Sequence, residues 1–194
     1  MPQIFGDFIE PGNSKEYLVL SFSPTSRPIQ KRWKNNGLSA DFLADYWMTF
    51  SPTKNVLLIK KQTAIKDAIS FIVNELLENA MKFNSDDAAV AIHMSLYFYN
   101  DKIRFYVTNG INSLQVNEFQ LFINKLLTEY PERLYITQLE NSVNDSTNKN
   151  SGLGFLIMLV DYHADLAWKF DVIHEVPKHE TVTTMAQINF LDTD

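Results

Sequence analysis

The sequence predicts an α+β fold: a two-layer sandwich in which one mixed, mostly antiparallel sheet carries helices on one face. Three observations lead to this prediction. Residues 62–84 have strong helical periodicity, β-rich runs occur in two pairs, and helical segments separate the pairs. The paired runs are residues 88–98 with 102–108 and residues 165–173 with 181–191. Segregated strand pairs and helices are typical of an α+β domain rather than of a parallel sheet.

The N-terminal region is expected to supply a strand and then a helix. Residues 17–22 (YLVLSF) are apolar and β-prone, which predicts the strand. Ser39 is placed to cap a helix over residues 40–50. An Asn-Asn-Gly turn at residues 35–37 is expected to split the region in front of that helix.

Residues 1–55 therefore read as an N-terminal extension packed on a main domain of residues 56–194. Several aromatic side chains favour a place in the core, since large aromatic residues are usually buried. The alternative for those in the extension is a dimer face or a partner face, where aromatic residues are also favoured. The aromatic residues concerned are Trp33, Tyr46, Trp47, Phe50 and Trp168.

The predicted helix at 62–84 has two contrasting faces. Polar residues at spacings i, i+3, i+4 and i+7 lie on one side: Glu75, Glu78, Asn79 and Lys82. The opposite side is apolar and consists of Ile65, Ile69, Ile72, Val73, Leu76, Leu77 and Ala80. Two carboxylates, an amide and an amine along one stripe suit a metal–nucleotide site better than a plain solvated surface.

The strand pair that follows this helix carries two turn signals. Asn100-Asp101 predicts a hairpin between its two strands. Asn109-Gly110 is expected to end the second strand.

The region after this hairpin predicts a helix, a loop and a glycine turn. Residues 117–130 have a helical apolar face, and Pro131 lies beyond its end. Residues 140–150 are rich in Asn, Ser and Thr without an apolar stripe, which predicts a mobile loop able to act as a lid. Ser151-Gly152-Leu153-Gly154 then leads into an apolar helix. A turn around Pro177 is expected to join the last two strands.

Composition excludes several classes of protein. The chain has 194 residues, 45% of them hydrophobic, a net charge of −6 and no cysteine. Disulfides, thiolate metal sites and thiol catalysis are therefore excluded, and the acidic balance argues against a general nucleic-acid binder. The N-terminus lacks the features of a signal peptide, and no apolar run approaches the roughly 20 residues of a spanning helix. We expect a cytoplasmic protein with no membrane partner.

Three segments resemble motifs of the GHKL ATPase superfamily, which has the Bergerat fold. The segment from Glu75 to Phe83 resembles its N-box, residues 107–110 its G1 position, and residues 150–155 its G2 box. The resemblance covers roughly residues 60–191 and implies a GHKL-like domain over residues 56–194. The N-terminal part is similar to a cyanobacterial group of small stand-alone regulators, related to the anti-sigma-type serine/threonine kinases SpoIIAB, RsbW and SiaB.

The resemblance implies roles for the polar stripe. Asn79 corresponds to the Mg²⁺ ligand, since Mg²⁺ prefers oxygen ligands and retains waters and phosphate oxygens. Glu75 corresponds to the general base that orients or deprotonates a hydroxyl group. Lys82 corresponds to the basic residue near the phosphates. Glu78 is either a nucleotide-site residue or the structural partner of Lys82 at i+4. The alternative to each of these roles is that the residue lies on a solvated helix surface without a ligand.

The glycine turn is the expected phosphate cradle. Ser151, Gly152, Leu153 and Gly154 place backbone N–H groups at a helix start, where they favour anions, and glycine lets the backbone approach a phosphate closely. The alternative is an ordinary glycine turn in front of a helix.

The G1 position departs from the family pattern. Asn109 stands where the family has an aspartate that accepts a hydrogen bond from adenine, and Gly110 follows it without the second glycine. An asparagine can still accept through its carbonyl oxygen but lacks the charge. Adenine affinity and specificity are therefore in question, whereas the phosphate and metal end is not affected.

A complete histidine kinase is excluded, because no histidine lies on an upstream helical hairpin. All four lie within or after the predicted nucleotide site: His93, His163, His174 and His179. The phosphate acceptor must then belong to another protein.

Two functions remain. The first is a kinase with ATP and Mg²⁺ as cofactors that phosphorylates a Ser or Thr of a STAS-domain protein resembling an anti-sigma-factor antagonist. A sigma factor or another response regulator is a further candidate partner, and a homodimer is compatible with the aromatic extension. The second is a non-catalytic Bergerat-fold module that sequesters a regulatory partner and binds nucleotide weakly or not at all. The change at Asn109 favours the second, and the Glu75–Asn79 pair and the SGLG turn favour the first.

Overall fold

The computed structural model describes residues 1–12, 14–22, 29–50, 56–85, 90–144, 152–175 and 178–190. In chain order its elements are β1 (Gln3–Phe5), β2 (Glu16–Phe22), α1 (Ile29–Met48), α2 (Val56–Lys82), β3 (Ile92–Phe98), β4 (Lys102–Ile111), α3 (Ser113–Thr128), α4 (Pro131–Asn144), α5 (Leu153–Val160), β5 (Asp165–Glu175) and β6 (Lys178–Asn189).

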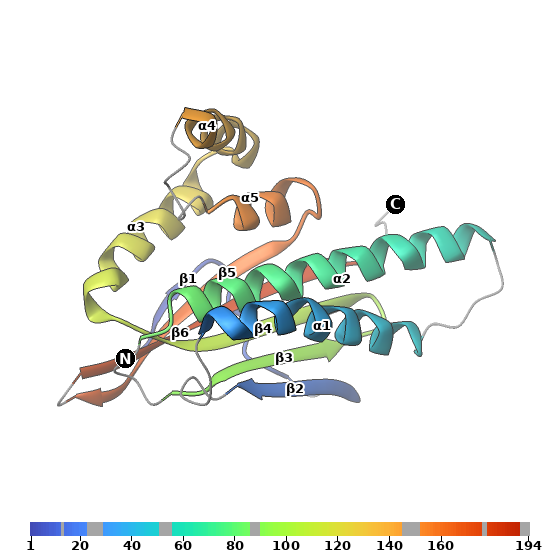
Figure 1. Cartoon of the computed structure of the whole chain (residues 1–194), viewed down its shortest axis with the longest axis horizontal. Helices are drawn as coiled ribbons and strands as arrows, with labels where there is room; N and C mark the ends of the chain where they lie inside the picture. Colours follow the sequence, from blue (N-terminus) through green and yellow to red (C-terminus); the bar gives the residue numbers. More distant parts are fainter. Residues whose placement is uncertain are drawn as a thin grey trace.

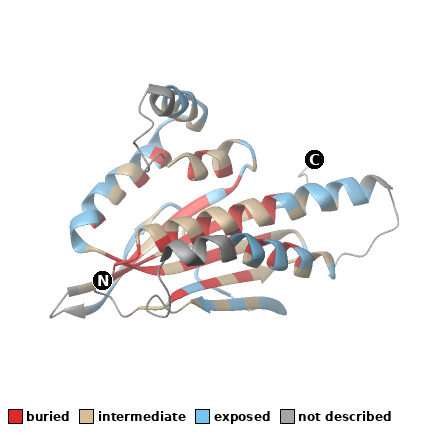
Figure 2. Cartoon of the chain, in the orientation of Figure 1, coloured by how far each residue is buried: buried red, intermediate tan, exposed pale blue. Residues whose placement is uncertain are grey.

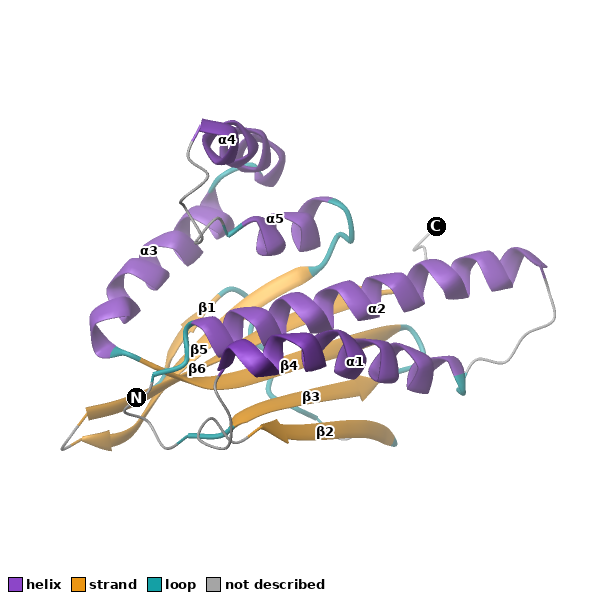
Figure 3. Cartoon of the chain, in the orientation of Figure 1, coloured by secondary structure: helices purple, strands orange, loops and turns teal. Residues whose placement is uncertain are grey.

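The strands form one six-stranded sheet in the order β1-β5-β6-β4-β3-β2, and every pairing is antiparallel. The helices lie on one face of this sheet, with α1 and α2 side by side over it and α4 farther out, beyond α5 (Figures 1 and 3). The predicted α+β two-layer sandwich is confirmed. The hairpin predicted at Asn100-Asp101 is also confirmed, since Phe98 lies opposite Ile103 across it.

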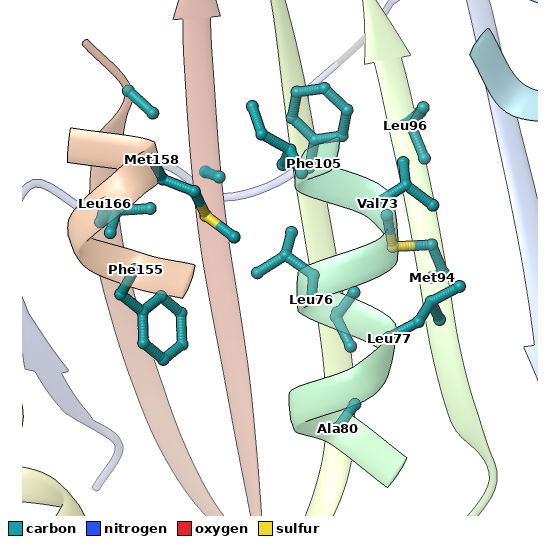
Figure 4. Close-up of a cluster of buried hydrophobic side chains, with 14 of the residues drawn as sticks. Val73, Leu76, Leu77, Ala80, Met94, Leu96, Phe105, Phe155, Met158 and Leu166 are labelled. Atoms are coloured by element: carbon teal, nitrogen blue, oxygen red, sulfur yellow. The ribbon is translucent and has the colours of Figure 1, made fainter. Parts of the chain in front are cut away.

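The apolar face of α2 is the centre of the core. Its side chains point at the sheet beside those of α5 (Figure 4). Ile69, Ile72, Val73 and Leu77 are fully buried, as the helical spacing predicted. The N-terminal end of α2 is pale in Figure 2 because it projects past this core, where Leu58 remains 49% exposed.

The N-terminal residues are part of the same sheet and helix layer. β1 pairs with β5 at one edge and β2 pairs with β3 at the other. α1 packs on α2, and its buried residues are Ala40, Leu43, Ala44 and Trp47. Trp168 is completely buried, whereas Phe50 is 42% exposed, so the predicted core aromatics divide between core and surface.

A short N-terminal segment covers part of the other face of the sheet. The Tyr106 hydroxyl donates a hydrogen bond to the Ile9 carbonyl over 2.7 Å, and Phe8 packs against the Tyr106 ring. Lys169 forms an ion pair with Glu10 at 2.8 Å. Burial raises the pKa of Tyr106 to about 12, so this phenol is a neutral donor at ordinary pH.

Two local predictions in the first half of the chain are wrong. The Asn-Asn-Gly segment at 35–37 and Ser39 lie inside α1, so this segment is no turn and Ser39 no cap. Packing of α1 on α2 overrides the weak helix propensity of these residues, and a helical glycine costs only about 1 kcal/mol. Asn109-Gly110 does not end its strand either, because β4 continues to Ile111, paired with Glu180 of β6.

The predicted lid is partly wrong. α4 includes residues 140–144, which the polar composition had assigned to a mobile loop. This helix is held by Leu134 and Tyr135, which pack against the core. Its N-terminus at Pro131 confirms that α3 ends before this proline. The rest of the predicted lid, residues 145–150, and the turn at Pro177 lie outside the described residues.

Within the described part of the chain, none of the helices combines the length and the apolar character needed to cross a bilayer.

Candidate functional site

A cavity of about 240 Å³ opens between the C-terminal half of α2, the start of α5, α3 and the strands β4 and β6. It brings together the three sequence segments that predicted a site. The predicted residues that line it are Glu75, Glu78, Asn79, Lys82, Asn109, Gly152, Leu153 and Gly154. Gly110 does not line it, and Ser151 lies outside the described residues. The roles of these residues remain predictions, but their proximity is a property of the fold.

Glu75 lies where the helix and the glycine turn meet. A Cβ added at Gly154 would overlap the Glu75 carboxylate, so this carboxylate is packed directly against the glycine backbone. Burial raises the pKa of Glu75, the neighbouring Glu78 raises it further, and Lys82 lowers it. The raised pKa makes Glu75 a stronger base than an ordinary surface glutamate.

Glu78 and Lys82 continue the polar stripe towards the end of α2. Burial raises the pKa of Glu78, and the positive charge of Lys82 opposes this shift. The Lys82 ammonium lies 5.3 Å from the ring centre of Phe83, within the range of a cation–π contact. Asn79 is half-buried between the two and faces the same cavity.

The glycine turn needs both of its glycines. Gly152 has φ of +61°, a left-handed conformation that glycine adopts without strain. A side chain there would also collide with the ring of Phe122 on α3. Gly154 must lack a side chain because of Glu75. The start of α5 thus places glycine backbone against the Phe122 ring and the Glu75 carboxylate at the wall of the cavity.

The other end of the cavity is formed by the sheet. Asn109 is only 4% exposed, and its amide nitrogen donates a hydrogen bond to the Gly110 carbonyl at 2.8 Å. With the amide nitrogen engaged, the side-chain oxygen of Asn109 is the acceptor left for a ligand. Thr184 of β6 lies opposite Val107 of β4, and both also line this end.

Gly110 connects β4 to the residues that follow α2 instead of lining the cavity. Its N–H donates a hydrogen bond to the Asn84 side-chain oxygen at 3.0 Å, and its carbonyl accepts one from the Ser85 N–H at 3.1 Å. These bonds tie the end of α2 to β4. They therefore fix the distance between the polar stripe and Asn109, although sequence reasoning did not single out Asn84 or Ser85.

Sequence reasoning also missed the wall supplied by α3. Gln115, Glu118, Phe119 and Phe122 line the cavity. The spacing of Phe119 and Phe122 predicted an apolar helix face, but nothing local shows that this face borders the site. Asn112 caps α3 by accepting a hydrogen bond from the Leu114 N–H at 2.9 Å, which sets the direction in which the helix leaves β4.

The residues fit a Mg²⁺–nucleotide. Gly152 and Gly154 line the cavity at a helix start, where backbone N–H groups favour anions, and Asn79 offers one oxygen of the kind Mg²⁺ prefers. Within the described residues, no group of three or more Asp, Glu and His side chains could hold a metal ion. A Mg²⁺ ion at Asn79 would take its other ligands from phosphate oxygens and water.

No protein-family model and no curated protein matches this sequence. The chain is similar in structure to a chain in "The crystal structure of SiaB-SiaC complex from Pseudomonas aeruginosa". The TM-score is 0.57, the identity is 13%, and the match covers 88% of this chain and 89% of that one. At this identity the similarity concerns the fold, which this chain shares over most of its length with a chain of that complex.

Proposed function

We propose that this chain is a Mg-ATP-dependent serine/threonine protein kinase that acts on a regulatory partner protein, a STAS-domain protein being the expected substrate. The observation that carries the proposal is the contact between Glu75 and Gly154. It joins the candidate base to the candidate phosphate cradle, from segments almost 80 positions apart in the sequence.

In this proposal the cavity residues have separate roles in phosphate binding, metal binding and proton transfer. Gly152 and Gly154 would let phosphate oxygens reach the backbone at the start of α5, and Asn79 would hold Mg²⁺. ATP, when bound, supplies the phosphoryl group, and ADP is the leaving product. The Glu75 carboxylate would take the proton from the partner's hydroxyl group, a task for which its raised pKa suits it.

The similarity to a chain of the SiaB-SiaC complex supports a partner protein, because that neighbour belongs to an assembly of two proteins. A partner-switching role is the regulatory role that we propose for such a kinase. The proposed acceptor is a Ser or Thr hydroxyl group of this partner protein.

A second function is favoured by the charge of the cavity. Three carboxylates line it (Glu75, Glu78 and Glu118) against the ammonium of Lys82. Asn109 also stands where the superfamily that the sequence resembles has a charged adenine acceptor. A triphosphate without Mg²⁺ would be repelled by such a wall. The alternative is therefore a module that sequesters a partner and binds nucleotide weakly.

The test combines calorimetry with phosphotransfer. The protein is titrated with ADP and ATP, with and without Mg²⁺, and then incubated with Mg-ATP and STAS-domain proteins encoded in the same genome. Glu75→Gln should reduce transfer by about 10²- to 10⁴-fold, the usual contribution of a general base, while nucleotide affinity persists. Glu132→Gln, an exposed glutamate at the start of α4, is the matched control and should change neither quantity.

The outcomes separate the two functions. Absence of nucleotide binding and of transfer, with tight binding of a partner, would establish the sequestering module. Transfer that survives Glu75→Gln at the original rate would remove Glu75 from the role of base.

A further inference from the structure

The helix α3 connects the two ends of the cavity. It begins at Ser113, directly after β4, whose Asn109 and Ile111 line the sheet end of the cavity. From there it runs towards α5 (Figure 1). At its far end the ring of Phe122 is packed against Gly152, where an added Cβ would collide with it. The wall supplied by α3 therefore extends from the proposed adenine end to the proposed phosphate end.

Glu118 lies midway along this wall. Helical spacing places Gln115, Glu118 and Phe122 on one face, at intervals of three and four residues, and all three line the cavity. At a rise of about 1.5 Å per residue, Glu118 is about 6 Å from Phe122 along the helix axis and about 7 to 8 Å from Ser113. The Glu118 side chain therefore borders the middle of the cavity, between its two ends.

The Glu118 carboxylate is available to a ligand. Its side chain is exposed, and among the residues that the structure describes it takes part in no hydrogen bond and no ion pair. The other two carboxylates of the cavity have close neighbours. Glu75 is packed against Gly154, and Glu78 lies within the field of the Lys82 charge. Glu118 is the carboxylate of the cavity whose place no contact with the described protein explains.

Only some parts of a nucleotide can face a carboxylate. The phosphates carry negative charge and would be repelled by it. An ionised carboxylate only accepts hydrogen bonds, so it needs a donor, and the ribose offers two in its adjacent 2′- and 3′-hydroxyl groups. The ribose joins the base to the phosphates, just as Glu118 lies between the two ends of the cavity. Dinucleotide-binding folds use a carboxylate for ribose hydroxyl groups in the same way.

We propose that Glu118 is a specificity-determining residue, whose carboxylate accepts hydrogen bonds from the ribose hydroxyl groups and thereby selects ribonucleotides over 2′-deoxyribonucleotides. The inference rests on the nucleotide binding proposed above, but not on phosphotransfer, on the metal ligand or on the partner protein. Glu118 belongs to none of the three sequence segments that predicted the site. It reaches the cavity because of the direction in which α3 leaves β4, which the Asn112 cap sets.

The test measures how much the 2′-hydroxyl group contributes to binding. Calorimetry in the presence of Mg²⁺ gives the affinities for ADP and for 2′-deoxy-ADP. Hydrogen bonds to charged groups change an affinity by about ten-fold or more, so the wild type should bind ADP at least about ten-fold more tightly than 2′-deoxy-ADP. Glu118→Ala should bring this ratio close to one. Glu118→Gln keeps one acceptor oxygen and should give an intermediate ratio.

The ratio of the two affinities is the decisive quantity. Removing the Glu118 charge also lessens the repulsion of the phosphates, but this effect is the same for both nucleotides and cancels in the ratio. Glu129→Gln is the matched control, because it removes the same charge from an exposed residue at the end of α3 that does not line the cavity. It should leave the ratio unchanged. Alanine is favoured at an exposed helix position, so Glu118→Ala should fold, and thermal melting checks this.

Two outcomes overturn the proposal directly: equal binding of ADP and 2′-deoxy-ADP by the wild type, and discrimination that persists in Glu118→Ala. A third is a loss of affinity in Glu118→Ala that is equal for both nucleotides and occurs only with Mg²⁺, since Glu118 would then bind the metal and not the ribose. In all three cases ADP still binds, so the proposed function stands. A wild type that binds no ADP contradicts the kinase and, with it, the role of Glu118.

Discussion

The two ends of the cavity differ in how the chain builds them. At one end, α2 and the start of α5 place charged side chains against bare glycine backbone. At the other end, β4 and β6 hold Asn109 and Thr184, which are 4% and 7% exposed and carry no charge. The first end consists of half-buried carboxylates whose pKa values burial raises. The second consists of neutral groups fixed by the sheet.

This difference shows how each end can recognise a ligand. Charged groups on a helix face suit the phosphates, the metal and the proton transfer, where charge develops. A neutral amide locked to the backbone by its hydrogen bond to Gly110 offers a single acceptor of fixed direction. In the kinase proposed above, the phosphate end would therefore supply the chemistry, and the adenine end would supply orientation and selectivity.

The largest effect is expected from Gly154→Ala. The new methyl group would displace the Glu75 carboxylate and fill the phosphate cradle, so phosphotransfer should fall by about 10²-fold or more. Alanine is favoured over glycine in a helix by about 1 kcal/mol, but the displacement of the half-buried Glu75 side chain opposes this gain, so the variant should be less stable than helix preference alone would make it. Phosphotransfer, calorimetry with ADP and thermal melting measure these three quantities.

Gly37→Ala is the matched control for this substitution. Gly37 is also helical, and a Cβ there would meet nothing within 4 Å. It should gain about 1 kcal/mol of stability, more than Gly154→Ala, with unchanged transfer. If Gly154→Ala keeps full activity, the contact with Glu75 does not organise the phosphate end.

An intermediate effect is expected from Asn109→Asp. A carboxylate would strengthen the bond to an adenine amino group, with about ten-fold tighter ADP binding. It would also lose the donor to the Gly110 carbonyl, so the free protein should melt at a lower temperature. Inosine diphosphate lacks the amino group and should not gain affinity. If the affinities for ADP and inosine diphosphate change equally, or if neither changes, Asn109 does not contact the adenine amino group.

The smallest effect is a shift of the pH profile by Glu78→Gln. Glu78 raises the pKa of Glu75, so removing its charge should lower that pKa. A base acts in its deprotonated form, and the acidic limb of the transfer rate should therefore move to lower pH. Lys82→Gln should move it to higher pH, because Lys82 lowers the pKa of Glu75. If the acidic limb of the pH profile does not move in either variant, this limb reports the titration of a group other than Glu75.

The sequence by itself determined α2 and its two contrasting faces well. A period of 3.6 residues is a local property, so the apolar face of α2 and the stripe from Glu75 to Lys82 could be predicted without knowing the rest of the chain. The strands β2 to β6 and the two-layer class followed from similarly local patterns. The glycine turn was recognisable because backbone conformation and close approach restrict the residue type.

Tertiary structure decided what those elements meet. The continuity of α1 through Gly37 and the existence of α4 depend on packing against other elements, which overrides local propensity. The wall formed by Phe119 and Phe122, the bond from Gly110 to Asn84 and the pairing of Val107 with Thr184 join residues far apart in the chain. The place of β2 at the end of the strand order likewise appears only once the strand order is known. Such contacts depend on how the elements are arranged around the common core, and no local pattern encodes that arrangement.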